Sequence, residues 1–295
     1  MTKQQKILQT SEPQTTEIIP LEAEVMLRPL LYKIHNENCL DTLAKLPSEC
    51  IDLIVTSPPY DDMRTYKGYT FEFEKIVVEL SRVLKRGGVL VWVVNDQTID
   101  GSETLTSCKQ KIYFRENCGL NIHDTMIYEK NNFSNPSNNR YHQIFEYIFI
   151  LSKGSPNTFN PIKDKPILWG DSWGKNTNRQ VDGSLKETNK RKNWTGEMGM
   201  RTNIWKYNVG GLGMSSVDQE AHEHPAIFPE DLAKDHILSW SNEGDIVYDP
   251  FSGSGTTCKV ADRLGRVWLG SEIAEEYCSV ALRRISKDLF TKAST

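Results

Sequence analysis

The chain has 295 residues, of which 38% are hydrophobic and 25% are charged, as in an ordinary soluble protein that can bury a sizeable core. It contains no apolar run as long as a membrane span and no signal pattern at its start, so we expect a cytoplasmic protein without a membrane partner. Its six cysteines show no Cys-x-x-Cys spacing, which argues against a disulfide framework and a zinc site, and we expect no metal.

The net charge of −4 is distributed unevenly along the chain. Between Lys153 and Lys206 there are eleven Lys or Arg against five Asp or Glu, a local balance of +6 that leaves −10 on the rest. A basic patch on an acidic body is typical of a surface that binds a polyanion.

The first half of the chain predicts alternating strands and helices. Residues 1–24 are polar and lack periodicity, which predicts a flexible arm without chemistry of its own. Strands are predicted at 32–36 and 51–55, with a short helix at 41–46 between them. Asn38 lies in the turn after the first strand, at the carboxyl end where ligands of α/β proteins bind.

The stretch Thr56-Ser57-Pro58-Pro59-Tyr60 follows the second strand and carries the most unusual chemistry of the chain. Its two prolines fix the backbone and supply no N–H group. A flat substrate with an amino group suits this arrangement, since Tyr60 could stack on its face while Ser57 Oγ and the Pro58 carbonyl accept the amino hydrogens. The nitrogen lone pair could then attack an electrophile. Pro-Pro-Tyr also occurs in exposed polyproline ligands, so the pentapeptide alone leaves both interpretations open.

Periodicity predicts further elements up to residue 151. A helix over 73–84 should end in a basic last turn with glycine stop signals at 85–88, and the apolar run 89–94 should be a strand buried on both faces. A helix at 103–116 and strands at 122–128 and 145–151 continue the alternation, with an Asn-rich loop at 130–142. The pattern predicts a mostly parallel, twisted sheet with helices on both faces.

The pattern is interrupted between residues 152 and 223, where Gly, Asn, Trp and Lys dominate. Since disordered segments are poor in aromatics, four of the seven tryptophans in this stretch favour an irregular inserted module. We expect these tryptophans to anchor its small core: Trp169, Trp173, Trp194 and Trp205. Six basic residues of the module are predicted to contact nucleic-acid phosphates: Lys175, Arg179, Lys190, Arg191, Lys192 and Arg201. Regular structure should resume with a helix whose first position is Pro229.

Residues 245–257 predict a strand, a glycine turn and a helix, and residues 266–272 predict a second strand that ends in Glu272. Gly253 and Gly255 would let a ligand approach the backbone, while a carboxylate at the place of Glu272 typically accepts from ribose hydroxyls. The third glycine of the dinucleotide fingerprint is missing, so S-adenosylmethionine is favoured over NAD. The Asp249 carboxylate would then bind the ammonium group of the cofactor.

These motifs resemble those of the DNA amino-methyltransferases. The pentapeptide is similar to their catalytic motif (Asp/Asn/Ser)-Pro-Pro-(Tyr/Phe/Trp), and the sequence from Asp249 is similar to their cofactor motif Asp-Pro-Phe-x-Gly-x-Gly-Thr-Thr. Residues 224–229 resemble the segment that precedes the cofactor motif in this family. The catalytic motif comes first and the cofactor motif last, which is the circularly permuted order of the β class.

The resemblance implies a Rossmann-like fold in four parts: an arm (1–24), a catalytic half (25–151), a target-recognition insertion (152–223) and a cofactor-binding half (224–295). Asn38 falls where many members have Asp near the adenine of the cofactor. The implied catalytic residues are Ser57, Pro58, Pro59 and Tyr60. The implied cofactor-binding residues are Asn38, Thr56, His224, Asp249, Phe251, Gly253, Gly255, Thr256 and Glu272.

The implied reaction is methyl transfer from S-adenosylmethionine to an exocyclic amine of a flipped base in duplex DNA. Cytosine C5 chemistry needs a Pro-Cys nucleophile, and the chain has no Pro-Cys pair. Ser before Pro-Pro favours N4 of cytosine, with N6 of adenine as the alternative. A catalytically idle DNA-binding protein and a methyltransferase of RNA or protein glutamine stay open. A cognate restriction endonuclease and a second copy of the chain in a homodimer are the further partners considered.

Overall fold

An eight-stranded sheet forms the centre of the computed structural model, which describes residues 21–59, 71–133, 136, 138–166, 177–187, 198–208 and 228–293. Its strands are β1 (Lys33–His35), β2 (Ile51–Thr56), β3 (Leu84–Val94), β6 (Asn121–Lys130), β7 (Phe145–Ser152), β12 (Ile204–Tyr207), β13 (Ile246–Asp249) and β14 (Val267–Ser271). Three two-stranded ribbons accompany it: β4 (Thr98–Ile99) with β5 (Ser102–Glu103), β8 (Lys163–Pro166) with β11 (Met198–Met200), and β9 (Thr177–Arg179) with β10 (Leu185–Glu187). The helices are α1 (Leu21–Leu27), the 3-10 turn η1 (Arg28–Leu30), α2 (Cys39–Lys45), α3 (Phe73–Val83), α4 (Thr106–Glu116), α5 (Glu230–Trp240), α6 (Thr256–Arg263) and α7 (Glu275–Ala293).

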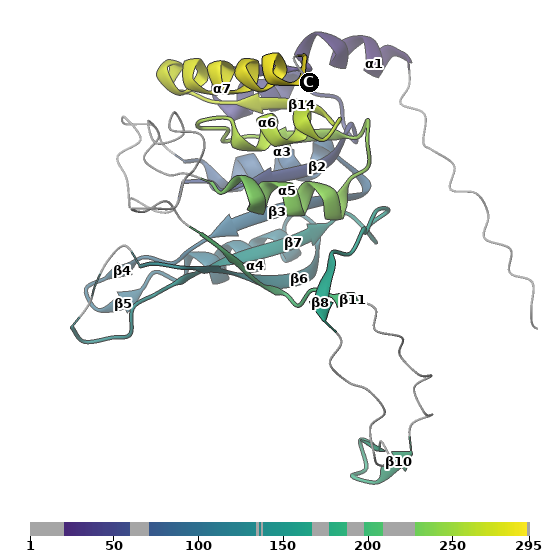
Figure 1. Cartoon of the computed structure of the whole chain (residues 1–295), viewed down its shortest axis with the longest axis vertical. Coiled ribbons are helices and arrows are strands. Elements are labelled where there is room, and N and C mark those ends of the chain that lie inside the picture. The colour runs from purple at the N-terminus through teal and green to yellow at the C-terminus, as the bar shows by residue number, and fades with distance from the viewer. Residues whose placement is uncertain are drawn as a thin grey trace, which may run out of the picture.

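The strand order is β1-β14-β13-β2-β3-β7-β6-β12 (Figure 1). All neighbours are parallel except β7, which is antiparallel to both β3 and β6. The sequence motifs therefore lie on the parallel half of the sheet, where the carboxyl ends of β2, β13 and β14 share one edge. The predicted mostly parallel sheet is confirmed.

Two separate sets of apolar side chains bury the two faces of the sheet. On one face, α5, α6 and α7 contribute buried residues such as Leu232, Val260 and Ala281. On the other face, α2, α3 and α4 contribute residues such as Leu43 and Phe114. Successive strand residues point to opposite faces, so a strand covered on both sides must be apolar throughout, as in the run 89–94.

The prediction that residues 85–88 form the last turn of a helix is wrong. Helix α3 ends at Val83, and β3 begins directly at Leu84. Lys85 pairs with Asp52 of the neighbouring β2 at 2.7 Å, and the N–H of Gly87 donates to the carbonyl of Lys153 at 2.7 Å. These contacts with two other segments of the chain override the local signal of a basic, glycine-terminated turn.

Helix α4 begins at Thr106, three residues later than the Glu103 start predicted from the sequence. Glu103 belongs instead to the β4–β5 ribbon. Asp96 fixes the start of the helix, because its carboxylate accepts from the N–H of Ser107 at 2.9 Å and from the Ser107 hydroxyl at 2.5 Å.

Strand β12 lies within the range predicted for the insertion, yet it pairs with β6 at the edge of the central sheet. Trp205 of this strand is buried in the main core beside the α5 residue His236, at 4.7 Å between ring centroids. The prediction that Trp205 anchors a separate small core is therefore wrong. Trp169, Trp173 and Trp194 lie outside the described residues.

Helix α5 buries Leu232, Ala233, His236, Ile237 and Trp240. It begins one residue later than predicted, because Pro229 is the N-cap and Glu230 is the first helical residue. None of the helices among the described residues combines the length and the apolar character needed to cross a membrane.

Removal of a core side chain from α3 should destabilise the fold, whereas removal of an exposed one should not. Leu80 is fully buried and Val78 is 44% exposed on the same helix. We expect Leu80→Ala to lower the free energy of unfolding by about 2–5 kcal/mol. Val78→Ala should change it by less than about 0.5 kcal/mol. Urea denaturation followed by circular dichroism measures both, and equal effects would contradict this packing.

Candidate functional site

The two sequence motifs meet at the carboxyl ends of the adjacent strands β2 and β13. The hydroxyl of Thr56, the last residue of β2, donates to Oδ1 of Asp249, the last residue of β13, at 2.7 Å. These residues are 193 positions apart in the sequence, and both are buried. The hydrogen bond therefore joins the strand that delivers the Ser-Pro-Pro segment to the strand that delivers the glycine turn.

Asp249 is enclosed by donors of the protein itself. Its carboxylate also accepts from the N–H of Phe251 at 3.1 Å, while the neighbouring Thr257 hydroxyl donates to the carbonyl of Val55 at 3.3 Å. Burial raises the pKa of Asp249 from 3.8 to about 6, against the opposing effect of these hydrogen bonds. Only 5% of Asp249 is exposed, and its carboxylate holds the ends of β2 and β13 together. A direct contact with the ammonium group of the cofactor stays a prediction.

Glu272 holds the glycine turn from the side of β14. Its Oε2 accepts from the N–H of Gly253 and its Oε1 accepts from the N–H of Ala274, both at 2.9 Å. Burial raises the pKa of this carboxyl above its usual range. Glu272 remains partly exposed, and a carboxylate oxygen can accept more than one hydrogen bond, so it can also accept from a nucleoside hydroxyl.

Gly255 serves helix packing in addition to the turn. Its φ is +76°, and a Cβ at this position would lie 2.6 Å from the Cβ of Ala281 on α7. The contact with Ala281 gives Gly255 a packing role, and its role in ligand approach stays a prediction. Gly270 of β14 was missed by the sequence analysis, although a Cβ there would lie 2.1 Å from Ser252 Oγ. A glycine inside an otherwise apolar strand is the signal that could have identified it.

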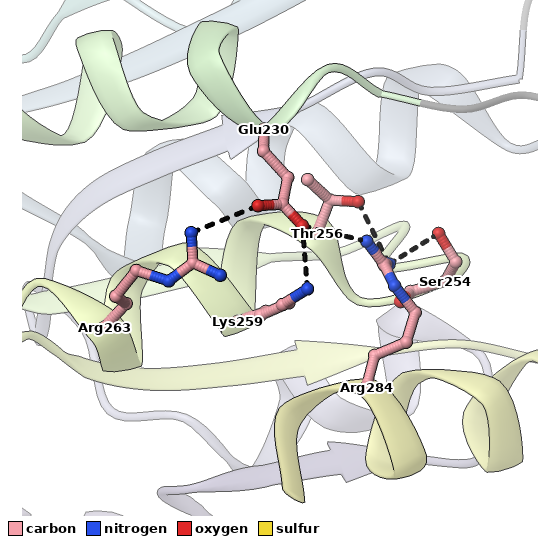
Figure 2. Close-up of polar contacts among 6 residues, drawn as sticks. All are labelled: Glu230, Ser254, Thr256, Lys259, Arg263 and Arg284. Carbon is pink, nitrogen blue, oxygen red and sulfur yellow. Dashed lines mark hydrogen bonds and ion pairs between the residues drawn. The ribbon is translucent and has the colours of Figure 1, made fainter. Parts of the chain in front are cut away.

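A polar network lies beneath the glycine turn (Figure 2). Arg284 of α7 donates through Nη1 to the carbonyl of Ser254, to Ser254 Oγ at 2.9 Å and to Thr256 Oγ1 at 3.2 Å. Glu230, the first residue of α5, binds Lys259 at 2.8 Å and Arg284 at 3.4 Å. Arg284 was missed, although its position on the buried stripe of α7, three residues after Ala281, could have pointed to it.

Three further predicted cofactor residues lie at the same edge. Thr256 is buried and binds Arg284, so its side chain stabilises the loop. Phe251 packs edge-on against Phe71, with 5.6 Å between ring centroids. Asn38 caps α2, because its Oδ1 accepts from the N–H of Leu40 at 2.9 Å, so this residue has a structural role of its own.

The predicted catalytic residues follow directly on β2. Pro58 is buried, while Ser57 and Pro59 are partly exposed. Tyr60 lies outside the described residues, as does the predicted cofactor residue His224. Thr56 connects the described part of this segment to Asp249 and thereby to the glycine turn.

The predicted DNA-binding residues are separated by the structure. Arg179 is exposed on β9, in a ribbon that extends beyond the edge of the sheet (Figure 1). Arg201 instead forms ion pairs with Asp164 and Asp235, each at 2.5 Å, and lies over the Trp205 ring. These contacts occupy the guanidinium and argue against the predicted phosphate contact of Arg201. Lys175, Lys190, Arg191 and Lys192 lie outside the described residues.

The chain is similar to known DNA methyltransferases. A family model described as DNA methylase, N6_N4_Mtase, matches residues 51–283. The orphan methyltransferase M.BamHII of Bacillus amyloliquefaciens is 54% identical over 80% of this chain and 88% of that protein. The DNA adenine methyltransferase YhdJ of Escherichia coli is 29% identical over 85% of this chain and 81% of that protein.

Two solved structures resemble the fold. The putative DNA modification methylase TTHA0409 of Thermus thermophilus, in complex with S-adenosyl-L-methionine, has a TM-score of 0.58 and 24% identity, over 87% of this chain and 93% of that one. The cytosine-N4-specific PvuII DNA methyltransferase has a TM-score of 0.60 and 18% identity, over 87% of this chain and 91% of that one. At these identities the likeness concerns the fold alone.

Gly255→Ala should lower the melting temperature, because it adds both a strained φ and a clash with Ala281. We expect the free energy of unfolding to fall by at least about 1–3 kcal/mol. Gly101 is the matched control, since its φ is +83° and nothing lies within 4 Å of the position of a Cβ. Gly101→Ala should therefore show the destabilisation that a positive φ causes without a clash. Equal losses in calorimetry would contradict the close approach of α6 and α7.

The raised pKa of Asp249 should appear in the pH dependence of stability. The folded protein binds this proton more tightly than the unfolded one, so its contribution is most favourable below pH 4 and is lost as the pH rises through about 6. We expect the stability of Asp249→Asn relative to the parent to rise by about 2–3 kcal/mol between pH 4 and pH 7. Urea denaturation across this range measures it, and parallel curves would refute the raised pKa.

Proposed function

Because this chain belongs to the N6/N4 DNA methylase family, we propose that it transfers a methyl group from S-adenosylmethionine to the N4 amino nitrogen of cytosine in duplex DNA. The family assignment makes the chain an S-adenosylmethionine-dependent DNA amino-methyltransferase. The hydrogen bond between Thr56 and Asp249 carries the proposal for the site, because it brings the segment for the amine and the turn for the cofactor to one sheet edge.

The side chains around the glycine turn fit a nucleoside cofactor. Glu272 is oriented by two backbone N–H groups and remains partly exposed, as a ribose-binding carboxylate should be. Phe251 is held by Phe71 and offers an apolar surface for the adenine. We assign cofactor binding to Gly253, Phe251 and Glu272, with Asp249 and Thr256 holding the turn. When bound, the sulfonium of S-adenosylmethionine supplies an electrophilic methyl group.

The Ser-Pro-Pro segment would prepare the amine for attack. Ser57 Oγ and the Pro58 carbonyl accept the two amino hydrogens, which turns the nitrogen lone pair out of conjugation with the base. The amine is shielded inside a duplex, so the base must flip and stack on Tyr60. The Ser-Pro-Pro segment begins immediately after Thr56, so the hydrogen bond between Thr56 and Asp249 fixes the position where the segment starts.

Cytosine is proposed because Ser precedes the Pro-Pro pair, as is more common in the N4-cytosine enzymes. Adenine N6 is the second candidate. The observation in its favour is the 29% identity with YhdJ, which is named a DNA adenine methyltransferase. Both reactions use the same geometry at the amine, so one experiment distinguishes them.

DNA recognition is proposed for the insertion at residues 152–223, with the exception of β12, which pairs within the central sheet. Exposed Arg179 on its ribbon suits a phosphate contact. A cognate restriction endonuclease and a homodimer stay predictions from the sequence.

The identity of the base can be read from the product. We expect DNA of mixed sequence, incubated with the protein and S-adenosylmethionine, to yield N4-methylcytosine when hydrolysed to nucleosides and analysed by mass spectrometry. N6-methyladenine would replace the proposal with the second candidate. DNA binding without methyl transfer would indicate a catalytically idle DNA-binding protein.

Ser57→Ala tests the role of the hydroxyl. Loss of one prepared acceptor should lower kcat by about 10²–10³-fold, with little change in the affinity for S-adenosylmethionine measured by calorimetry. Ser286→Ala, which alters an exposed hydroxyl on α7, is the control and should leave kcat unchanged. Normal turnover of Ser57→Ala would refute the assigned role.

A further inference from the structure

We propose that Arg284 is a positioning residue for the cofactor site, which holds the glycine turn in the shape that binds S-adenosylmethionine. The inference rests on the proposed placement of the cofactor at this turn. Arg284 lies on α7, behind the turn, and its side chain is 1% exposed. It therefore acts through the turn and not on the cofactor itself.

One guanidinium nitrogen of Arg284 reaches both ends of the segment Ser254–Thr256. Nη1 donates to the carbonyl and the hydroxyl of Ser254 and to the hydroxyl of Thr256 (Figure 2). Such charge-assisted hydrogen bonds are stronger than those between neutral groups. The turn also contains Gly255 with a φ of +76°, and because glycine has access to many backbone conformations, contacts from outside the turn help to select this one.

The backbone of Gly253 and Ser254 links the hydrogen bonds of Arg284 to Glu272. The carbonyl of Ser254 is held by Arg284, and the N–H of the preceding Gly253 donates to Glu272 Oε2 at 2.9 Å. If the guanidinium is removed, the Ser254 carbonyl can rotate, and the backbone dihedrals of Gly253 and Ser254, which place the Gly253 N–H, are less constrained. The carboxylate proposed to bind the ribose then loses a donor that orients it.

Glu230 fixes the guanidinium from the other side. Its Oε1 accepts from Arg284 Nη2 at 3.4 Å and from Lys259 Nζ at 2.8 Å, and its Oε2 accepts from Arg263 at 3.2 Å. A buried cation requires such a partner, because desolvation without one is costly. Glu230 is also the first residue of α5, so the network ties the start of this helix to the cofactor turn.

A second buried arginine offers a matched control. Arg266 donates to the carbonyl of Ser241 at 2.8 Å, to the Ser241 hydroxyl at 3.1 Å and to the carbonyl of Leu264 at 2.7 Å. It is 7% exposed, and it lies before β14, at the opposite end of that strand from Glu272. Its substitution should cost stability without affecting the cofactor turn.

The experiment compares Arg284→Met, Arg284→Lys and Arg266→Met in the full chain. Affinity for S-adenosylmethionine is measured by calorimetry, duplex DNA affinity by fluorescence anisotropy, and stability by thermal denaturation. We expect Arg284→Met to weaken the affinity for S-adenosylmethionine and to raise the KM for S-adenosylmethionine, each by about tenfold or more. The change in kcat at saturating cofactor should be smaller. Arg284→Lys should restore part of the affinity, since one ammonium can replace some of the hydrogen bonds. Arg266→Met should lower the melting temperature and leave cofactor affinity unchanged.

Two outcomes would overturn the inference. Cofactor affinity of Arg284→Met equal to that of the parent would show that the turn keeps its shape without the guanidinium. An equal loss of affinity in Arg266→Met would show that reduced stability alone is responsible. Glu272→Ala separates these results from the proposed function: if it also binds S-adenosylmethionine normally, the cofactor site itself is misplaced.

Discussion

The hydrogen bond between Thr56 and Asp249 is the interaction on which the site depends. It is formed between two buried side chains at the ends of neighbouring parallel strands, where the low local dielectric strengthens it. The Asp249 carboxylate also accepts from the N–H of Phe251, so one residue fixes the start of the Ser-Pro-Pro segment and the start of the glycine turn. The raised pKa of Asp249 reflects the free-energy cost of burying its charged carboxylate.

Much of the fold could be predicted because the apolar runs are long and the strands are covered on both faces. The family, the cofactor and the mostly parallel sheet are confirmed. The errors occurred where contacts distant in sequence override local signals. The glycines at 87 and 88 read as a helix stop, although β3 passes through them beside β2 and residue 153. Strand β12 has only four residues, too few to show a period, and its place depends on pairing with β6.

The sequence motifs pointed to segments that lie together at one edge of the sheet, but not to the contacts of their residues. Residue types and spacing identified the segments that contain Asp249, Gly253 and Glu272. They could not distinguish a residue that contacts a ligand from one that supports the loop. Gly255 is required by Ala281, a residue 26 positions later, and no local pattern encodes that contact. The hydrogen bonds of Arg284 to the turn are hidden in the same way.

The antiparallel ribbon of β8 and β11 has a consequence for the evolution of this protein. Pro166 lies opposite Met198, so the chain leaves the body of the protein and returns to it at adjacent points. A segment with neighbouring ends can change in length and composition at small entropic cost to the remaining fold. Given the role in DNA recognition that we propose for the insertion, exchange of residues 167–197 would change the target preference without a change at the sheet edge.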